Sequence, residues 1–184
     1  MKKPILIAEV KTASPHDNIW TVSWHAMFKI ADSVGDILSI HTDAHWWWHF
    51  DLITEAKWLT DTPIMAKGIH RTDEEILEAI ERWASHVLVV GRIPEVHLDK
   101  CFIEVESLKQ LKDFYAKLWD DTKFVWNSRD LSDGSLKTET FEEARDIFPG
   151  WLCQASNIDS IDDVKPWADA ILVWKALENF VKTL

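Results

Sequence analysis

The chain has 184 residues, of which 47% are hydrophobic, so it can form one substantial domain but is too short for two ordinary ones. Its formal net charge of −11 argues against nucleic acid or an anionic membrane surface as the main partner, because phosphate contacts need clustered lysine and arginine. The sequence contains neither a membrane-length apolar segment nor a signal-peptide core, and its two cysteines, Cys101 and Cys153, lack metal-ligand spacing. We therefore expect a cytoplasmic protein with reduced thiols.

In chain order, short aliphatic runs alternate with stretches of helical spacing. The first run, ILIAEVK, predicts a buried strand that ends in polar residues. Eight such runs predict strands over 5–11, 37–43, 63–69, 86–92, 100–105, 123–128, 151–156 and 170–174. Amphipathic stretches predict helices over 20–34, about 50–60, 73–84, 107–119, 140–148 and 160–168, and a last one from about 176.

Local signals support this order of elements. Thr72 with Glu75, and Thr140 with Glu143, fit the reciprocal pattern of a capping box at a helix start. The connection over 93–99 contains proline and is too short for a crossover helix, so we expect a loop or a single turn there. Apolar strands alternating with helices favour a parallel sheet, and eight repeats favour a closed barrel. The sequence therefore predicts a single α/β domain, a (β/α)8 TIM barrel shortened from the usual length of about 250 residues.

Polar residues interrupt several predicted strands near their carboxyl ends. In a TIM barrel, inward side chains at these ends line the active site. For any one of them, a strand end reaching solvent is the simpler interpretation. Their recurrence in several strands of one ring favours convergence on a single opening. They are Glu9, Lys11, Lys67, Glu104, Asn127 and Ser156.

These segments also carry a resemblance to a known family. The stretch IAEVKTASP resembles the signature of indole-3-glycerol phosphate synthase, whose first strand ends in Glu-x-Lys followed by Ser-Pro. Further segments that resemble the family follow in its order: LSIHTDAHWW, PIMAKGI, FIEVESLKQL, WNSRDL and ASNIDSIDDV. The likeness covers almost the whole chain, and its most specific parts are the first-strand motif and NSRDL.

The resemblance implies a decarboxylating ring closure in tryptophan biosynthesis. The family converts the phosphorylated small molecule 1-(2-carboxyphenylamino)-1-deoxyribulose 5-phosphate to indole-3-glycerol phosphate, without a metal or an organic cofactor. By similarity, Lys67 acts as a general acid and Lys11 holds the substrate carboxylate or donates a proton. Glu104 acts as base or acid in the dehydration. Glu9 and Asn127 orient the lysines and the substrate hydroxyls.

The phosphate site departs from the family pattern. The family binds phosphate with backbone amides of Ser-Gly after strand seven and Gly-Ser after strand eight, where this chain has Ser156-Asn157 and Trp174-Lys175. Asparagine tolerates the left-handed conformation, so Asn157 is a mild change, whereas Trp174 is a bulky one. Arg129 matches the family's phosphate-contacting arginine, and Lys175 is expected to add positive charge.

Two further segments carry candidate substrate-binding residues. Ser14 belongs to the first-strand motif. The third strand has Lys-Gly-Ile at 67–69 where the family usually has Lys-Asp-Phe, so its aromatic partner for the anthranilate ring is missing. Trp46 or Trp47, in the loop HWWWH, is expected to replace that partner. The resemblance also implies that the family's helix before the first strand is absent here and that its fourth helix is deleted.

The tryptophans in the predicted helices are expected to pack against the barrel. Their large side chains suit a short chain that has few residues to fill its helix layer. They fall in predicted helices and are Trp20, Trp24, Trp58, Trp83, Trp119 and Trp167.

The sequence also contains residues that suit functions other than the lyase. His41, Asp43 and His45 alternate along one strand face and could ligate zinc, but a clear fourth ligand is lacking. Ser14 and Ser156 lack the elbow motif of a serine nucleophile. Two alternatives remain: another phosphosugar enzyme such as an isomerase, and a non-catalytic barrel that binds a ligand or partner. The uncovered side of the barrel beside strand four is a candidate contact in a homo-oligomer.

Overall fold

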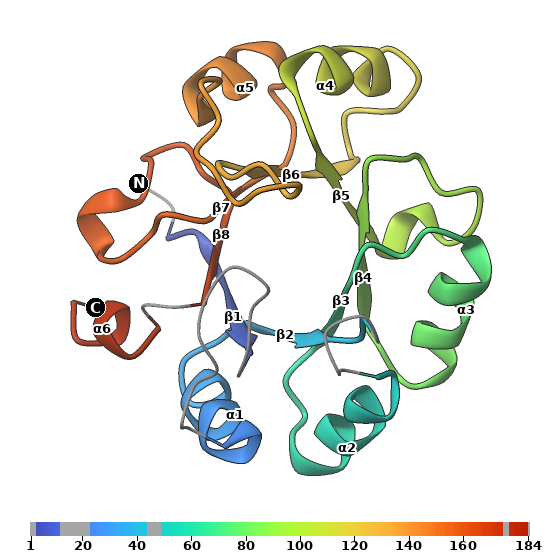
Figure 1. The fold of residues 1–184 in the computed structure, drawn as a ribbon, viewed down its shortest axis with the longest axis vertical. Helices are drawn as coiled ribbons and strands as arrows, with labels where there is room; N and C mark the ends of the chain where they lie inside the picture. Colours follow the sequence, from blue (N-terminus) through green and yellow to red (C-terminus); the bar gives the residue numbers. More distant parts are fainter. Residues whose placement is uncertain (1–2, 12–22, 44–48, 175–176, 184) are drawn as a thin grey trace.

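The computed structural model describes residues 3–11, 23–43, 49–174 and 177–183. Within them, eight parallel strands pair in chain order, and the last strand returns to the first, so that the sheet closes (Figure 1). This architecture confirms the predicted (β/α)8 barrel. The strands are β1 (Ile5–Val10), β2 (Ile37–His41), β3 (Ile64–Lys67), β4 (His86–Val90), β5 (Cys101–Val105), β6 (Lys123–Asn127), β7 (Leu152–Ala155) and β8 (Ala170–Val173).

Helices surround the strands, and two of them begin at the capping signals in the sequence. Thr72 and Thr140 each accept a hydrogen bond from a backbone N–H three residues later and form the two predicted capping boxes. The described α-helices are α1 (Trp24–Asp32), α2 (Asp51–Leu59), α3 (Asp73–Glu81), α4 (Leu108–Tyr115), α5 (Phe141–Ile147) and α6 (Leu177–Val181). The described part of the chain also forms two single 3-10 turns, η2 (Leu98–Lys100) and η3 (Ile161–Asp163).

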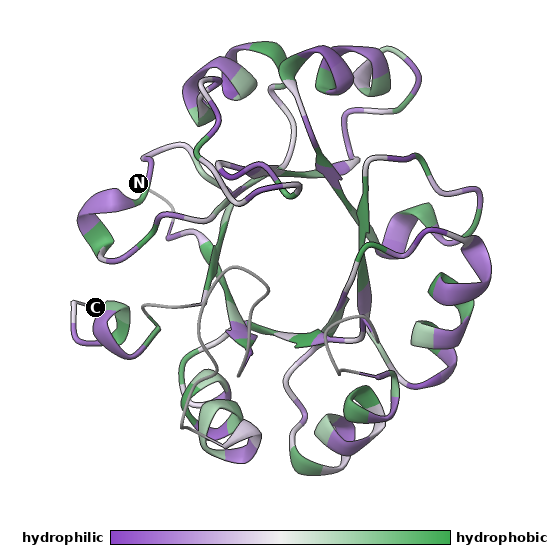
Figure 2. Cartoon of the chain, viewed as in Figure 1, coloured by the Kyte–Doolittle hydropathy of each residue, from purple (hydrophilic) through white to green (hydrophobic). Residues whose placement is uncertain are grey.

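Each strand contributes to two hydrophobic layers, because successive side chains point to opposite faces of a strand. Inward residues such as Ile7, Met65 and Phe102 fill the barrel, and outward residues such as Ile40 and Trp126 pack under the helices. Figure 2 shows mainly hydrophobic strands, with hydrophilic residues at the tips of β1 and β5. The barrel interior is therefore a packed core that becomes polar at the carboxyl ends of the strands.

The two cysteines lie one in each layer. Cys153 belongs to the interior and Cys101 to the outer layer, and both are buried free thiols. Burial raises the pKa of the Cys101 thiol to about 12, so the thiolate form is disfavoured.

The connection between β4 and β5 contains only the turn η2, as the proline and the short length predict. Gly91 follows β4 with a φ of 70°, which favours glycine. His97, before η2, also has a left-handed φ, of 45°. These two turns bring the chain back to the barrel without a helix.

The predicted helix over 160–168 is wrong, because only η3 forms there. The backbone at Val164 is extended, as is favoured shortly before Pro166, whose ring cannot continue a helix. The Gln154 side chain accepts a hydrogen bond from the Lys165 N–H at 2.9 Å and donates one to the Asp163 carbonyl at 3.0 Å. These side-chain contacts satisfy backbone groups that a helix would have paired.

The prediction that the helical tryptophans pack against the barrel is mostly wrong. Trp24 packs against the core and stacks on Phe28. Trp83 and Trp119 lie beyond the ends of α3 and α4, where helical spacing no longer directs a side chain inward. Four tryptophans are largely exposed: Trp58 (86%), Trp83 (66%), Trp119 (77%) and Trp167 (48%). Trp20 lies outside the described residues.

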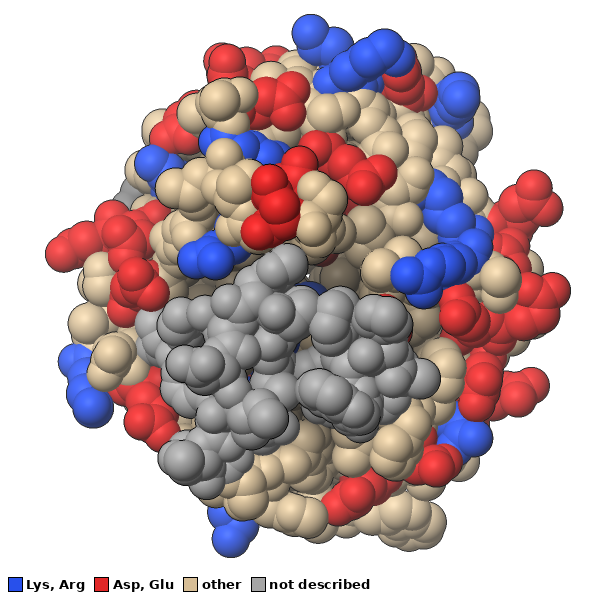
Figure 3. Space-filling model, viewed as in Figure 1, with Lys and Arg blue, Asp and Glu red and all other residues tan. Residues whose placement is uncertain are grey.

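Charged side chains of both signs are interspersed around the outer helices. Figure 3 shows acidic residues alternating with lysine and arginine over the described part of this face. In the described ranges, no helix combines the length and the apolar character needed to cross a membrane.

Candidate active site

The two charges at the end of β1 face the interior of the barrel. Glu9 follows Ile5 and Ile7 on the inner face of the strand, and Lys11 comes two residues later. The Glu9 side chain is almost completely buried, with a relative exposure of 2%. A buried carboxylate needs charged or hydrogen-bonding partners to offset its lost hydration, and the neighbouring strands supply them.

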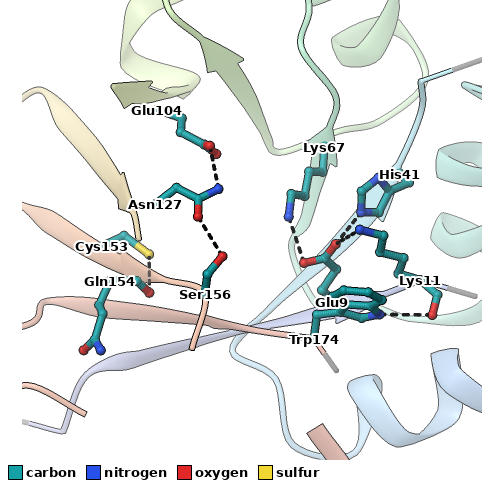
Figure 4. Close-up of polar contacts among 10 residues, drawn as sticks. All are labelled: Glu9, Lys11, His41, Lys67, Glu104, Asn127, Cys153, Gln154, Ser156 and Trp174. Atoms are coloured by element: carbon teal, nitrogen blue, oxygen red, sulfur yellow. Dashed lines mark hydrogen bonds and ion pairs between the residues drawn. The ribbon is translucent and has the colours of Figure 1, made fainter. Parts of the chain in front are cut away.

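Glu9 is surrounded by three cationic or hydrogen-bonding side chains, which with it form the Glu9 cluster (Figure 4). The Lys67 Nζ, from the end of β3, donates to the Glu9 Oε2 at 2.8 Å. The His41 Nε2, from the end of β2, forms a short hydrogen bond to the Glu9 Oε1. The Lys11 Nζ lies 4.0 Å from the same Oε1. The cluster thus joins three adjacent strands through one carboxylate.

The partners of Glu9 decide the ionisation of this cluster. Burial disfavours the carboxylate, but Lys67, His41 and Lys11 together overcome it and hold the pKa of Glu9 well below its usual range. Burial lowers the pKa of His41 to about 4, although Glu9 opposes that shift. At neutral pH the pair is therefore a carboxylate and a neutral imidazole, and His41 donates the shared proton.

A second group, the Glu104 chain, lies on the other side of the opening (Figure 4). Glu104 is the residue before the last one of β5, and its Oε1 accepts a hydrogen bond from the Asn127 Nδ2 at 2.8 Å. The Asn127 Oδ1 in turn accepts bonds from the Ser156 Oγ at 2.7 Å and the Arg129 N–H at 3.0 Å. Burial raises the pKa of Glu104, with Lys67 and Asn127 opposing the rise. Glu104 is therefore the carboxyl that binds a proton more readily, whereas Glu9 stays ionised.

Lys67 connects the two groups electrostatically. It is the strongest cationic influence on both Glu9 and Glu104. Its side chain is 18% exposed, so it is only partly shielded from solvent. The arrangement offers a proton donor on a lysine, a fixed carboxylate that orients it, and a second carboxyl able to exchange protons.

The predicted phosphate-binding residues Arg129, Ser156 and Asn157 also lie together. The Arg129 Nε donates to the Asn157 Oδ1 at 3.3 Å. Ser156 and Asn157 have φ values of 67° and 54°, in the left-handed region. Asparagine tolerates this conformation better than most residues, whereas serine adopts it rarely.

Trp174 occupies the end of β8 beside Lys11. The Lys11 Nζ lies 3.9 Å from the centroid of the Trp174 ring, and the Trp174 Nε1 donates to the Lys11 carbonyl at 3.4 Å. A cation over an indole face is attracted by the ring electrons. Lys11 is therefore held between Glu9 and Trp174.

The glycine after β3 has a structural cause. A Cβ at Gly68 would lie 2.9 Å from the Thr42 Oγ1 and 3.3 Å from the His70 ring. His70 is buried, and its two ring nitrogens lie 2.5 Å from the Leu88 carbonyl and 3.0 Å from the Thr42 Oγ1. A side chain at position 68 would therefore crowd Thr42 and His70, which favours glycine there.

Several predicted residues are not placed. Ser14, Trp46, Trp47 and Lys175 lie outside the described residues, as does His45 of the zinc hypothesis. Among the described ranges, no group of three or more His, Cys, Asp and Glu side chains is arranged to hold a metal.

The sequence patterns do not single out two residues of the site. They indicate His41 only as a possible metal ligand. Its position at a strand end, two residues after an inward-facing one, is nevertheless a signal that it faces the barrel opening. Lys137, in the loop before α5, borders a small open pocket beside Glu104. Burial lowers the pKa of Lys137, and Glu104 opposes that shift. Lys137 lies in a loop, so its position in the sequence gives no indication that it approaches Glu104 of β5.

The buried histidines make stability pH-dependent. Burial lowers the pKa of His41, His70 and His86, so the unfolded chain binds protons below about pH 6.5 that the folded chain does not. We expect the free energy of unfolding to fall between pH 6.5 and pH 4, with about 3 kcal/mol from His41 alone. The raised pKa of Glu104 has the opposite effect on the free energy of unfolding, because the folded chain binds this proton more readily than the unfolded chain. This is one carboxyl against three histidines.

Urea unfolding followed by circular dichroism at pH 7 and pH 4.5 measures this effect. A His41→Gln variant, which cannot bind the extra proton, should show a shallower fall. A free energy of unfolding that is constant over this range would contradict the prediction.

The closed parallel barrel, with polar side chains gathered at the carboxyl ends of its strands, has the architecture of a TIM-barrel protein with its candidate active site at the usual end. A scan against protein-family models and a search of the curated proteins each found no match to this chain. The resemblance to indole-3-glycerol phosphate synthase therefore rests on the motifs quoted from the sequence.

Proposed function

We propose that the chain catalyses the ring closure of 1-(2-carboxyphenylamino)-1-deoxyribulose 5-phosphate to indole-3-glycerol phosphate, carbon dioxide and water. The observation that carries this proposal is the position of Lys67. It contacts the ionised Glu9 at 2.8 Å and influences Glu104, a carboxyl whose pKa is shifted the other way. Two carboxyls with divergent proton affinities and a lysine between them suit a reaction that needs both an acid and a base.

The first step forms the carbon–carbon bond. The ring carbon that carries the carboxylate attacks the ketone carbon of the sugar, and the ketone oxygen takes a proton from the Lys67 ammonium group. Lys11, near the opening, binds the substrate carboxylate through its positive charge. Glu9 keeps the ammonium of Lys67 directed at the reacting oxygen. This use of Lys67 is supported by its partial exposure and its fixed partner.

The later steps lose carbon dioxide and water. Cleavage of the bond to the carboxylate returns its electron pair to the ring. The new hydroxyl then leaves as water, and a proton is lost from the adjacent sugar carbon to form the indole double bond. Glu104 exchanges the proton in this dehydration, with Asn127 fixing its carboxyl at 2.8 Å. A carboxyl with a raised pKa is suited to that exchange.

The phosphate is proposed to bind next to Arg129. Asn157 retains the left-handed backbone conformation where the family has glycine, and the Arg129 guanidinium lies within hydrogen-bonding distance of the Asn157 side chain. An arginine that is already fixed loses less entropy when it binds phosphate. Ser14 and Lys175 are further phosphate or substrate contacts by resemblance.

Replacement of Glu104 by glutamine tests the proposal. The Glu104→Gln variant keeps the size of the side chain but cannot exchange a proton, so we expect the turnover number to fall by about 10²- to 10⁴-fold with little change in KM. Indole-3-glycerol phosphate is measured by its fluorescence after separation from the protein. The matched control is Glu81→Gln, on the exposed surface of α3, which should keep full turnover. Wild-type protein without turnover would refute the lyase.

A barrel that binds its ligand without turnover is the second candidate, and Trp174 favours it. The Trp174 ring holds Lys11, the residue proposed to bind the substrate carboxylate, at the place where the family has a small residue. Isothermal titration with the same substrate separates the two candidates. Binding with carbon dioxide release supports the lyase, and binding without release supports the second candidate.

A further inference from the structure

His41 is built into the candidate site at a position that the proposed chemistry does not use. It ends β2, the strand between β1 and β3, and it pairs in register with Lys67. Its side chain is 9% exposed and that of Glu9 is 2% exposed, so their hydrogen bond is shielded from water. Figure 4 shows the imidazole beside the carboxylate, on the side away from the Glu104 chain.

The Glu9 carboxylate has two oxygens with different partners. Oε2 accepts from the Lys67 Nζ at 2.8 Å. Oε1 accepts from the His41 Nε2, with the Lys11 Nζ more distant at 4.0 Å. Without another partner, either ammonium group could bind either oxygen of the carboxylate. The His41 imidazole binds Oε1, so Oε2 is the oxygen that remains for Lys67.

We propose that His41 is a positioning residue, whose neutral imidazole donates its Nε2 proton to Glu9 and thereby fixes the Lys67 ammonium toward the reacting carbonyl oxygen. This inference rests on the proposed role of Lys67 as the proton donor. The donor must be neutral, because a charged imidazole would compete with both lysines for the same carboxylate. Burial and the two nearby ammonium groups disfavour the protonated imidazole.

Within the described ranges, the charged groups that act on His41 come from two neighbouring strands. Glu9 and Lys11 belong to the β1 segment and Lys67 to β3. Glu9 favours the protonated imidazole, whereas burial, Lys67 and Lys11 disfavour it. Loss of the neutral imidazole therefore removes a hydrogen bond without removing a charge. The Lys67 ammonium can then shift from Oε2 toward Oε1.

Three variants test the inference. His41→Leu removes the hydrogen-bond donor, and His41→Gln keeps an N–H donor. The control is His25→Leu, on the exposed side of α1. We expect His41→Leu to lower kcat by about 10- to 100-fold with KM changed less than about threefold, since a displacement of about 1 Å can cost this much. His41→Gln should recover most of kcat, and His25→Leu should match the wild type. A purely structural role would not be rescued by the amide.

Two measurements decide the inference independently of turnover. Nitrogen NMR of the wild type should show a neutral His41 with its proton on Nε2 at pH 7. Crystal structures should show the Lys67 Nζ displaced toward the Glu9 Oε1 in His41→Leu and in place in His41→Gln. A protonated His41, a proton on Nδ1, or an unmoved Lys67 in His41→Leu would overturn the inference. Wild type without turnover refutes only the lyase, because both measurements can still be made.

Discussion

Replacing Lys67 by alanine is expected to lower the turnover number for indole-3-glycerol phosphate by about 10²- to 10⁴-fold, the usual contribution of a positioned acid. The variant also leaves the buried Glu9 without its 2.8 Å ion pair. Turnover is measured as carbon dioxide release from the deoxyribulose phosphate substrate.

Lys67→Arg distinguishes proton donation from charge alone. Arginine keeps the positive charge but does not give up its proton at neutral pH, so we expect turnover to stay close to that of the alanine variant. Lys112→Ala, an exposed change on α4, is the matched control and should behave as wild type. An active Lys67→Arg variant would show that the lysine acts only through its charge.

The second large effect is on stability. Trp126 is fully buried on the outer face of β6, so Trp126→Ala is expected to lower the free energy of unfolding by about 3–5 kcal/mol. Trp58 is 86% exposed, so Trp58→Ala should change it by no more than about 0.5 kcal/mol. Urea unfolding followed by circular dichroism compares the same substitution in the two settings.

A third variant refines this comparison. The Trp126 Nε1 is buried and has no hydrogen-bond partner within the described residues. Trp126→Phe removes that unpaired donor and keeps an aromatic ring, so it should cost much less than alanine. Equal losses for Trp126→Ala and Trp58→Ala would mean that β6 does not pack as described.

The barrel could be predicted from sequence because each strand is a short apolar run flanked by polar residues. The observed strands begin and end within two residues of the predicted ones. The helix predicted over 160–168 does not form, because Pro166 cannot continue a helix and the Gln154 side chain, from β7, bonds the backbone at Asp163 and Lys165. Pro166 is a local signal against the helix, whereas no pattern within the segment carries information about Gln154.

The candidate site was predictable to the extent that it follows from strand phase. Glu9, Lys67, Glu104 and Asn127 are inward strand-end residues, and closure of the barrel is sufficient to bring them to one opening. The partner of His41 was not predictable, since it depends on the register of three strands. The sequence also does not reveal why residue 68 is glycine, because the cause is a contact made by His70 in the folded chain.

The pairing of β1 with β8 has a consequence for synthesis on the ribosome. Ile5 pairs with Ala170, so the ring cannot close until β8 has emerged from the ribosome. Before that moment β1 presents an unpaired row of backbone N–H and C=O groups to any strand nearby. Nascent chains, and chains that terminate before β8, therefore expose a strand edge that is paired in the closed barrel. Rapid completion of the chain, or binding by chaperones, limits aggregation through this edge.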